Sequence, residues 1–117
     1  MKITSYHLMS MPSAQCHVEF FRTDAGILRE IRLVSYTTTM LTAVYDGSNA
    51  KLFVNHYVGC SKTTARHVNR FTTELTGTNL YHELKKVPVD GMFIVNDAAV
   101  CLSDMAFKYA DHGKRCW

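Results

Sequence analysis

Residues 61–75, SKTTARHVNRFTTEL, decide the fold of this chain. The larger apolar residues and one threonine recur at spacings of four, three and four: Thr64, Val68, Phe71 and Leu75. That spacing places them on one face of a helix. Ser61 is a suitable N-cap, and Gly77 suits the left-handed position that ends many helices. The stretch therefore predicts one amphipathic helix over 61–76, which needs a sheet to cover its apolar face.

Cations occupy the opposite face of the same predicted helix. They recur every four residues, at Lys62, Arg66 and Arg70, and Lys85 and Lys86 follow shortly after it. Residues 51–86 hold six basic and two acidic side chains, a local charge of +4, whereas residues 1–50 hold four of each. A concentration of positive charge favours an acidic partner surface or nucleic acid. The alternative is an ordinary solvated helix face without a partner.

The remaining pattern is typical of an antiparallel α+β domain. Alternating β-branched and aromatic residues predict strands at 16–23, 27–36, 39–45, 51–57, 92–95 and 99–102. A short helix is expected at 80–86 after Asn79, and a last helix at 104–111 with Ser103 as its N-cap. Residues 1–14 are expected to be a strand or an ordered arm. We expect a single domain over residues 1–117, with about four to five strands packed on the main helix and one or two short helices.

Composition limits the class of protein. The chain has 117 residues, of which 47% are hydrophobic and 20% charged, and its net charge is +3. These values are typical of a folded globular domain. No run of 18 apolar residues is present to form a transmembrane helix, and the N-terminus lacks the apolar segment of a signal peptide. We therefore expect a cytosolic protein.

Six histidines and four cysteines are enough to supply zinc ligands. Two pairs have a separation of four residues, His56 with Cys60 and His112 with Cys116. Together they would give the tetrahedral nitrogen and sulfur coordination that zinc prefers. The usual CxxC knuckle is absent, so the alternative is a set of dispersed buried cysteines and exposed histidines.

The strings LVSYTTTMLTAVYDG and KLFVNHYVGCSKTTARHVNRF resemble a family of small uncharacterised proteins from phages, prophages and plasmids of Gram-positive bacteria. The shared pattern is an SY-T strand, a short hairpin and an (S)xTTxxHxxxF helix. In this chain the pattern falls on Ser35, Tyr36, Thr37 or Thr39, Ser61, Thr63, Thr64, His67 and Phe71. The match covers about a third of the chain. It implies an accessory protein of a mobile element, a class that includes inhibitors of CRISPR effector nucleases.

His67 is the motif residue most open to a chemical role. One turn before Phe71, it is expected to be a neutral, buried imidazole hydrogen-bonded to the sheet or to a strand-end carbonyl. Cys60 precedes it by seven residues, about 10 Å along a helix, which is too far for a nucleophile and its base. The sequence therefore predicts no catalytic residue.

Three functions fit these observations. The first is a non-enzymatic accessory protein that binds and inhibits host nucleic-acid-handling machinery, such as a CRISPR effector. The second is a small DNA- or RNA-binding regulator that uses the basic face of helix 61–76. The third is a protein-interaction domain stabilised by structural zinc.

Overall fold

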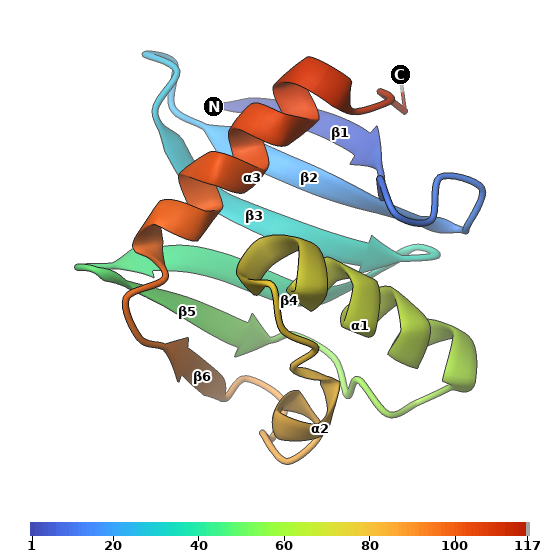
Figure 1. Ribbon diagram of the computed structural model, residues 1–117. Coiled ribbons are helices and arrows are strands. Elements are labelled where there is room, and N and C mark those ends of the chain that lie inside the picture. Colours follow the sequence, from blue (N-terminus) through green and yellow to red (C-terminus); the bar gives the residue numbers. More distant parts are fainter. Residues whose placement is uncertain (117) are drawn as a thin grey trace.

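Six antiparallel strands form one sheet whose spatial order follows the chain from β1 to β6 (Figure 1). The computed structural model describes residues 1–116. Its strands are β1 (Lys2–His7), β2 (Cys16–Arg22), β3 (Leu28–Ser35), β4 (Thr38–Asp46), β5 (Asn49–Val54) and β6 (Met92–Val95). Its helices are α1 (Lys62–Thr76), α2 (Tyr81–Leu84) and α3 (Ala99–His112). Only α1 and α2 interrupt the meander, between β5 and β6, and α3 follows β6.

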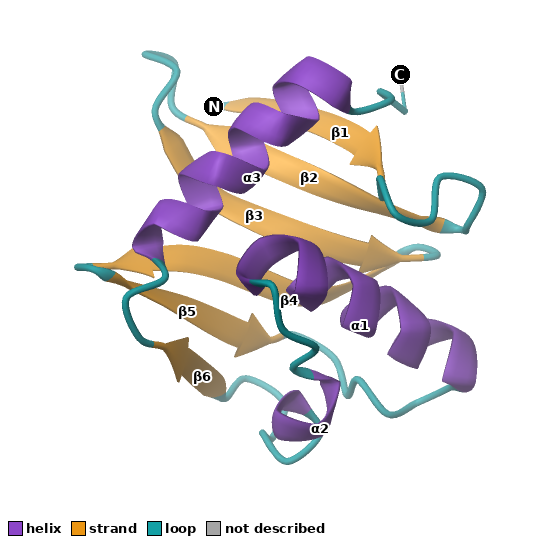
Figure 2. Cartoon of the chain, viewed as in Figure 1, coloured by secondary structure: helices purple, strands orange, loops and turns teal. Residues whose placement is uncertain are grey.

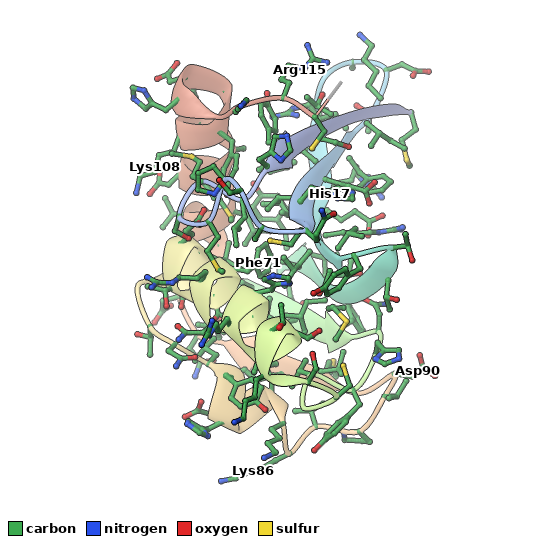
Figure 3. All side chains as sticks on the ribbon, turned by 90° about the vertical axis from the view of Figure 1, so that its right-hand side faces the viewer. His17, Phe71, Lys86, Asp90, Lys108 and Arg115 are labelled. Carbon is green, nitrogen blue, oxygen red and sulfur yellow. The ribbon has the colours of Figure 1, made fainter. Side chains whose placement is uncertain are left out.

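The helices and the sheet make two layers. α1 and α3 lie across one face of the sheet, with α2 at the lower margin (Figures 1 and 2). In the side view, the helices lie to the left and the strands to the right (Figure 3). Within residues 1–116 no helix is long and apolar enough to cross a membrane.

The core lies between these two layers. Period-two alternation turns one set of strand residues toward the helices, and these are fully buried: Val18, Phe20, Ile31, Leu33, Leu41, Ala43, Leu52 and Val54. The helices contribute the residues that cover them: Val68, Phe71, Leu75, Leu102, Met105 and Tyr109. Full burial of one large apolar side chain stabilises a fold by about 1.5–3 kcal/mol, so this seam is the main source of stability.

The main helix forms as the sequence predicts. Ser61 lies just before α1, in an extended conformation, and its hydroxyl accepts the backbone N–H of Thr64 at 3.1 Å. Gly77 ends the helix at φ 82°, and its N–H donates to the carbonyl of Thr73. Glycine suits that left-handed position because it has no Cβ to clash with the backbone. The predicted core residues Val68 and Phe71 are fully buried.

The α+β fold with an antiparallel sheet is confirmed, but the sheet is larger than the four to five strands expected. The extra strand is β1, in the segment expected to be a strand or an ordered arm. It pairs with β2 from Lys2 opposite Arg22 to His7 opposite His17. The predicted strand 51–57 is too long, since β5 ends at Val54. There the backbone of Val54 bonds to Asp90 and Gly91, and the next two N–H groups, of Asn55 and His56, both donate to the carbonyl of Met40.

The predicted strand at 99–102 is wrong. These residues form the first turn of α3, which begins five residues before the expected helix 104–111. Ser103 is therefore not an N-cap; it lies within the helix, where its hydroxyl is 2.6 Å from that of Tyr45. A four-residue apolar run fits a buried helix turn as well as a strand. The predicted short helix also shrinks, from 80–86 to the single turn of α2, with Asn79 accepting the N–H of Tyr81 at 2.9 Å.

Candidate binding surface

The outer side of α1 carries the three cations predicted to face away from the core. Lys62, Arg66 and Arg70 are all exposed, whereas His67 and Phe71 on the inner side have no exposed surface. Successive cations are separated by four residues, or about 6 Å of helix rise. Within residues 1–116, no carboxylate forms an ion pair with any of the three. The helix therefore presents a straight track of unpaired positive charge, which we call the cationic face.

The first of these charges, on Lys62, opposes the helix dipole. Lys62 is the first residue of α1, no acidic residue lies in the first turn, and no basic residue lies in the last turn. The N-terminus of a helix is its positive end, so a lysine there costs stability and a carboxylate would add it. The cationic face is thus not an arrangement that stabilises α1 itself.

Lys85 and Lys86 lie on the segment that follows α2. α2 is attached to α1 through the residue before it, because the N–H of Leu80 donates to the hydroxyl of Thr72 at 3.1 Å. The ammonium of Lys85 lies 5.9 Å from the ring of Tyr81. Lys86 is exposed and projects from the lower end of the molecule (Figure 3). The five predicted binding residues therefore belong to two elements that pack together.

The four predicted zinc ligands are not brought together. His56 and Cys60 are exposed in the loop after β5, whereas the N–H of Cys116 donates to the carbonyl of Ser5 on β1. Because β5 and β1 are four strand spacings apart, the two pairs are separated by about 19 Å. Within the described chain, no group of three His, Cys, Asp or Glu side chains is arranged to hold a metal. The pairing of His112 and Cys116 with His56 and Cys60 therefore has no geometric support.

The cysteines are only partly the buried residues expected of a reduced protein. Cys16 is 3% exposed, and burial, with smaller effects from Glu74 and Cys116, raises the pKa of its thiol to about 11. Cys60 is exposed and free, and the other two are partly buried. Cys16 is thus an inert core thiol, whereas Cys60 is a surface residue.

The two halves of the SY-T and TTxxHxxxF pattern meet beneath α1. The Ser35 hydroxyl lies 2.8 Å from Nδ1 of His67 and 3.3 Å from the hydroxyl of Thr64. The imidazole is fully buried, and Nε2 has no hydrogen-bond partner within residues 1–116. Burial lowers the pKa of His67, which keeps the ring neutral. The predicted structural role is confirmed, with a strand-end hydroxyl as the partner.

This cluster is closed to solvent. Ser35 is 2% exposed and His67 is 0% exposed, so a substrate has no access to the hydroxyl. No carboxylate of the described residues orients the imidazole, as a nucleophile–base pair would need. The motif residues instead fasten the start of α1 to the end of β3.

A second polar cluster was missed by the sequence analysis. Glu74 on α1 accepts the hydroxyl of Tyr109 on α3, and its other oxygen accepts both the N–H and the hydroxyl of Ser10. The Tyr109 oxygen in turn accepts the N–H of Met9 at 2.9 Å. These contacts join residues 35 to 100 positions apart, so no local pattern could have indicated them. An open pocket of about 340 Å³ lies beside the cluster, also lined by Met105 and Lys108.

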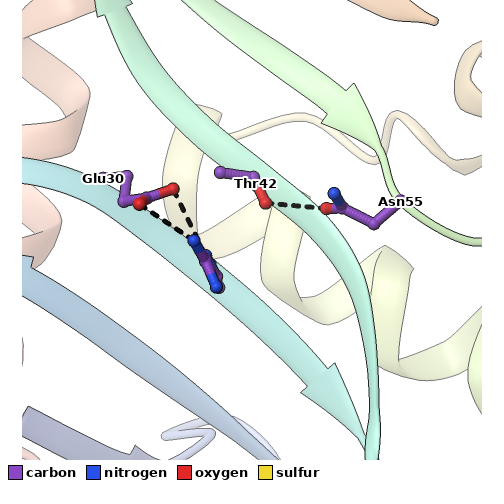
Figure 4. Close-up of polar contacts among 4 residues, drawn as sticks. Glu30, Thr42 and Asn55 are labelled. Atoms are coloured by element: carbon purple, nitrogen blue, oxygen red, sulfur yellow. Dashed lines mark hydrogen bonds and ion pairs between the residues drawn. The ribbon is translucent and has the colours of Figure 1, made fainter. Parts of the chain in front are cut away.

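The face of the sheet away from the helices holds a shallow polar groove of about 390 Å³. At its floor Arg32 donates to both carboxylate oxygens of Glu30, at 3.0 and 3.2 Å, and Thr42 donates to Asn55 at 2.7 Å (Figure 4). The guanidinium also lies 4.2 Å from the ring centre of Phe21. The charges of Arg32 and Glu30 satisfy each other, whereas Asp90, which also lines the groove, forms no ion pair within residues 1–116.

Comparison of the chain with protein-family models, with curated proteins and with solved structures gave no match. The function is therefore inferred from the surfaces of the molecule itself. The cationic face of α1 brings together three exposed charges on one helix, and none of them forms an ion pair within residues 1–116.

Proposed function

We propose that this protein is a non-enzymatic binding protein whose cationic face docks on an acidic surface of a partner protein. The observation that carries the proposal is the row of Lys62, Arg66 and Arg70, exposed and free of ion pairs along one helix. Lys62 opposes the helix dipole, and Arg66 and Arg70 lie in mid-helix and form no ion pair, so the row is better explained by an external partner than by the stability of α1. Lys85 and Lys86 extend the same positive surface.

The resemblance to proteins of phages and plasmids suggests the class of partner. Small accessory proteins of such elements act on host machinery that handles nucleic acid. We infer an inhibitor of that machinery, with a CRISPR effector nuclease as the leading target. The burial of Ser35 and His67 supports a binding role over a catalytic one, because the Ser–His pair of the shared motif is closed to substrate.

The experiment compares the native chain with an Arg66→Glu, Arg70→Glu variant. Tagged protein is used to capture partners from a host lysate, and captured proteins are identified and then purified for a direct binding measurement. The proposal expects one saturable partner that the variant loses. The matched control reverses two exposed cations elsewhere, Lys2→Glu and Arg29→Glu, and should keep the partner. A partner that binds both variants equally well, or no specific partner, contradicts the proposal.

Direct binding to DNA or RNA is the second candidate. The observation in its favour is the regular rise of about 6 Å between successive cations, which suits contacts to a line of phosphates. Three phosphate contacts would make the affinity fall steeply with salt, with a log–log slope of roughly −2 to −3. A gel-shift titration at several salt concentrations separates the two candidates. A protein partner that binds in the absence of nucleic acid favours the first.

A further inference from the structure

The two edges of the sheet are treated differently by the chain. The edge of β1 is occupied by the C-terminal segment, since Tyr6 forms an antiparallel bridge with Arg115. The N–H of His7 donates to the carbonyl of Lys114 at 2.8 Å, and the N–H of Cys116 donates to Ser5 at 3.0 Å. β6, at the opposite end, pairs only with β5 within residues 1–116. One edge is closed and the other is open.

The open edge lacks the side chains that usually protect one. β6 reads MFIV, with neither a charged residue nor a proline to discourage a second strand. Met92 is 50% exposed and Ile94 is 42% exposed, both on the sheet face that carries no helix. Every second residue of an edge strand also directs its backbone N–H and C=O outward. Those groups are complementary to an extended strand and to little else.

We propose that β6 pairs antiparallel with β6 of a second copy of this chain, so that the two sheets become one continuous sheet. Opposite residues in such a pair share a face, which restricts the register to alternate positions. With the two-fold axis at Phe93, each Phe93 faces its symmetry mate, and Met92 faces the partner's Ile94. All three central pairs are then apolar. Moving the axis to Ile94 would place Met92 opposite the polar residue at position 96 of the other copy.

Charge does not oppose this arrangement, although each copy carries +3. The nearest cation on the same face is Lys51, which lies opposite Ile94 on β5 and contacts Asp46 at 3.7 Å. In the dimer the two Lys51 side chains would be three strand spacings apart, about 14 Å, beyond the Debye length of about 8 Å at physiological salt. The uncharged edge thus lets two positively charged copies meet.

The closed β1 edge determines the size of the assembly. With one edge occupied by residues 114–116, two copies can join only through β6, and a two-fold pair leaves no further edge. The product is a closed dimer and not a filament. Pairing of two four-residue strands buries little surface, so the dimer is transient, with a dissociation constant of roughly 10–100 μM. α1 covers one face of the sheet and not this edge, so its cationic face stays accessible in the dimer.

Sedimentation equilibrium of the full chain, from about 5 to about 500 μM, measures the association by mass action. We expect a monomer–dimer equilibrium that Ile94→Lys weakens by roughly tenfold, because the symmetric contact repeats each substitution. Met92→Glu should weaken it to a similar extent. The combined Met92→Glu, Ile94→Lys variant should recover the dimer, because the stated register places position 92 of one copy opposite position 94 of the other.

The matched control is Phe107→Lys, at an exposed apolar residue on α3. This variant should leave the dimer intact. In the native chain, the β6 amides should exchange hydrogen more slowly at high protein concentration than at low concentration. A chain that stays monomeric throughout the range overturns the proposal. So does a dimer that is lost in Phe107→Lys or unchanged in Ile94→Lys, because the contact would then lie elsewhere. None of these results depends on the partner of the cationic face.

Discussion

The Ser35 hydroxyl at the end of β3 lies 2.8 Å from Nδ1 of His67 on α1, and both residues are buried. This contact links the two parts of the sequence pattern, the SY-T strand and the TTxxHxxxF helix. It fixes the N-terminal half of α1 over the sheet, and therefore fixes the direction in which Arg66 and Arg70 point. The buried Ser35–His67 contact therefore helps to hold the cationic face in position.

Removing the hydroxyl at this contact should destabilise the fold without changing its shape. Ser35→Ala leaves Nδ1 of a fully buried imidazole without its partner, which costs about 1–3 kcal/mol of unfolding free energy. Urea denaturation measures the loss. The control is Ser13→Ala, in an exposed loop, which should stay within about 0.5 kcal/mol of the native chain. Equal stability of the two variants would show that the contact is not formed in solution.

Acid should weaken the fold through His67. Burial lowers the pKa of this imidazole below its ordinary value of 6.5. The unfolded chain then takes up the proton first, so the free energy of unfolding is constant above about pH 6.5 and decreases as the pH falls below it. Urea midpoints measured across that range should show the decrease, and His67→Gln should reduce its slope. An NMR titration in which the His67 ring protonates near pH 6.5 would contradict the burial effect.

The residues of α1 were predictable because local patterns determine them. The N-cap Ser61, the buried Val68 and Phe71 and the left-handed Gly77 follow from spacing and backbone preference alone. The start of α3 was missed for the opposite reason. Ala99 to Leu102 is a short apolar segment, and it becomes helical where the N–H of Ala99 donates to the distant carbonyl of Ser48. No signal near residues 99–102 in the sequence could reveal that contact.

The candidate site divides in the same way. Exposure of Lys62, Arg66 and Arg70 follows from the helical period, so the cationic face could be read from the sequence. The four predicted zinc ligands do not come together, because the separation of His56 from Cys116 depends on the order of strands in the sheet. Sequence spacing within each pair carried no information about that order. The Glu74–Tyr109 contact could not be predicted either, because it joins two helices across 35 positions of the sequence.

Loss of the Tyr109 hydroxyl should loosen the packing of α3 on α1. Tyr109→Phe leaves an oxygen of Glu74 and the N–H of Met9 without their partner, which costs about 1–3 kcal/mol. Chemical denaturation of the variant measures this cost. Tyr6→Phe is the matched control, a ring 5.6 Å from that of Tyr109. If both substitutions cost the same, the two hydrogen bonds of the Tyr109 hydroxyl do not stabilise the fold.

Alkali should weaken the fold through the same residue. Burial, and then the hydrogen bond to Glu74, raise the pKa of Tyr109 well above its ordinary value of 10.0. The unfolded chain loses this proton first, so stability is retained below pH 10 and decreases as the pH rises above it. Ultraviolet titration should show one of the six tyrosines ionising only when the protein unfolds. Six tyrosines titrating together before any loss of structure would contradict this.

Substitution of Lys62 by glutamate should separate stability from binding. A carboxylate in the first turn of α1 interacts favourably with the positive end of the helix, so Lys62→Glu should raise the free energy of unfolding by about 0.5 kcal/mol. The same substitution removes one cation from the cationic face and adds an anion, so affinity for an acidic partner should fall several-fold. Thermal melting and a binding titration on the same sample measure the two effects. Lys62→Gln, which only removes the charge, should lie between the native chain and the glutamate variant in both. If Lys62→Glu stabilised the fold and left binding intact, the first turn of α1 would lie outside the contact, which would then rest on Arg66 and Arg70.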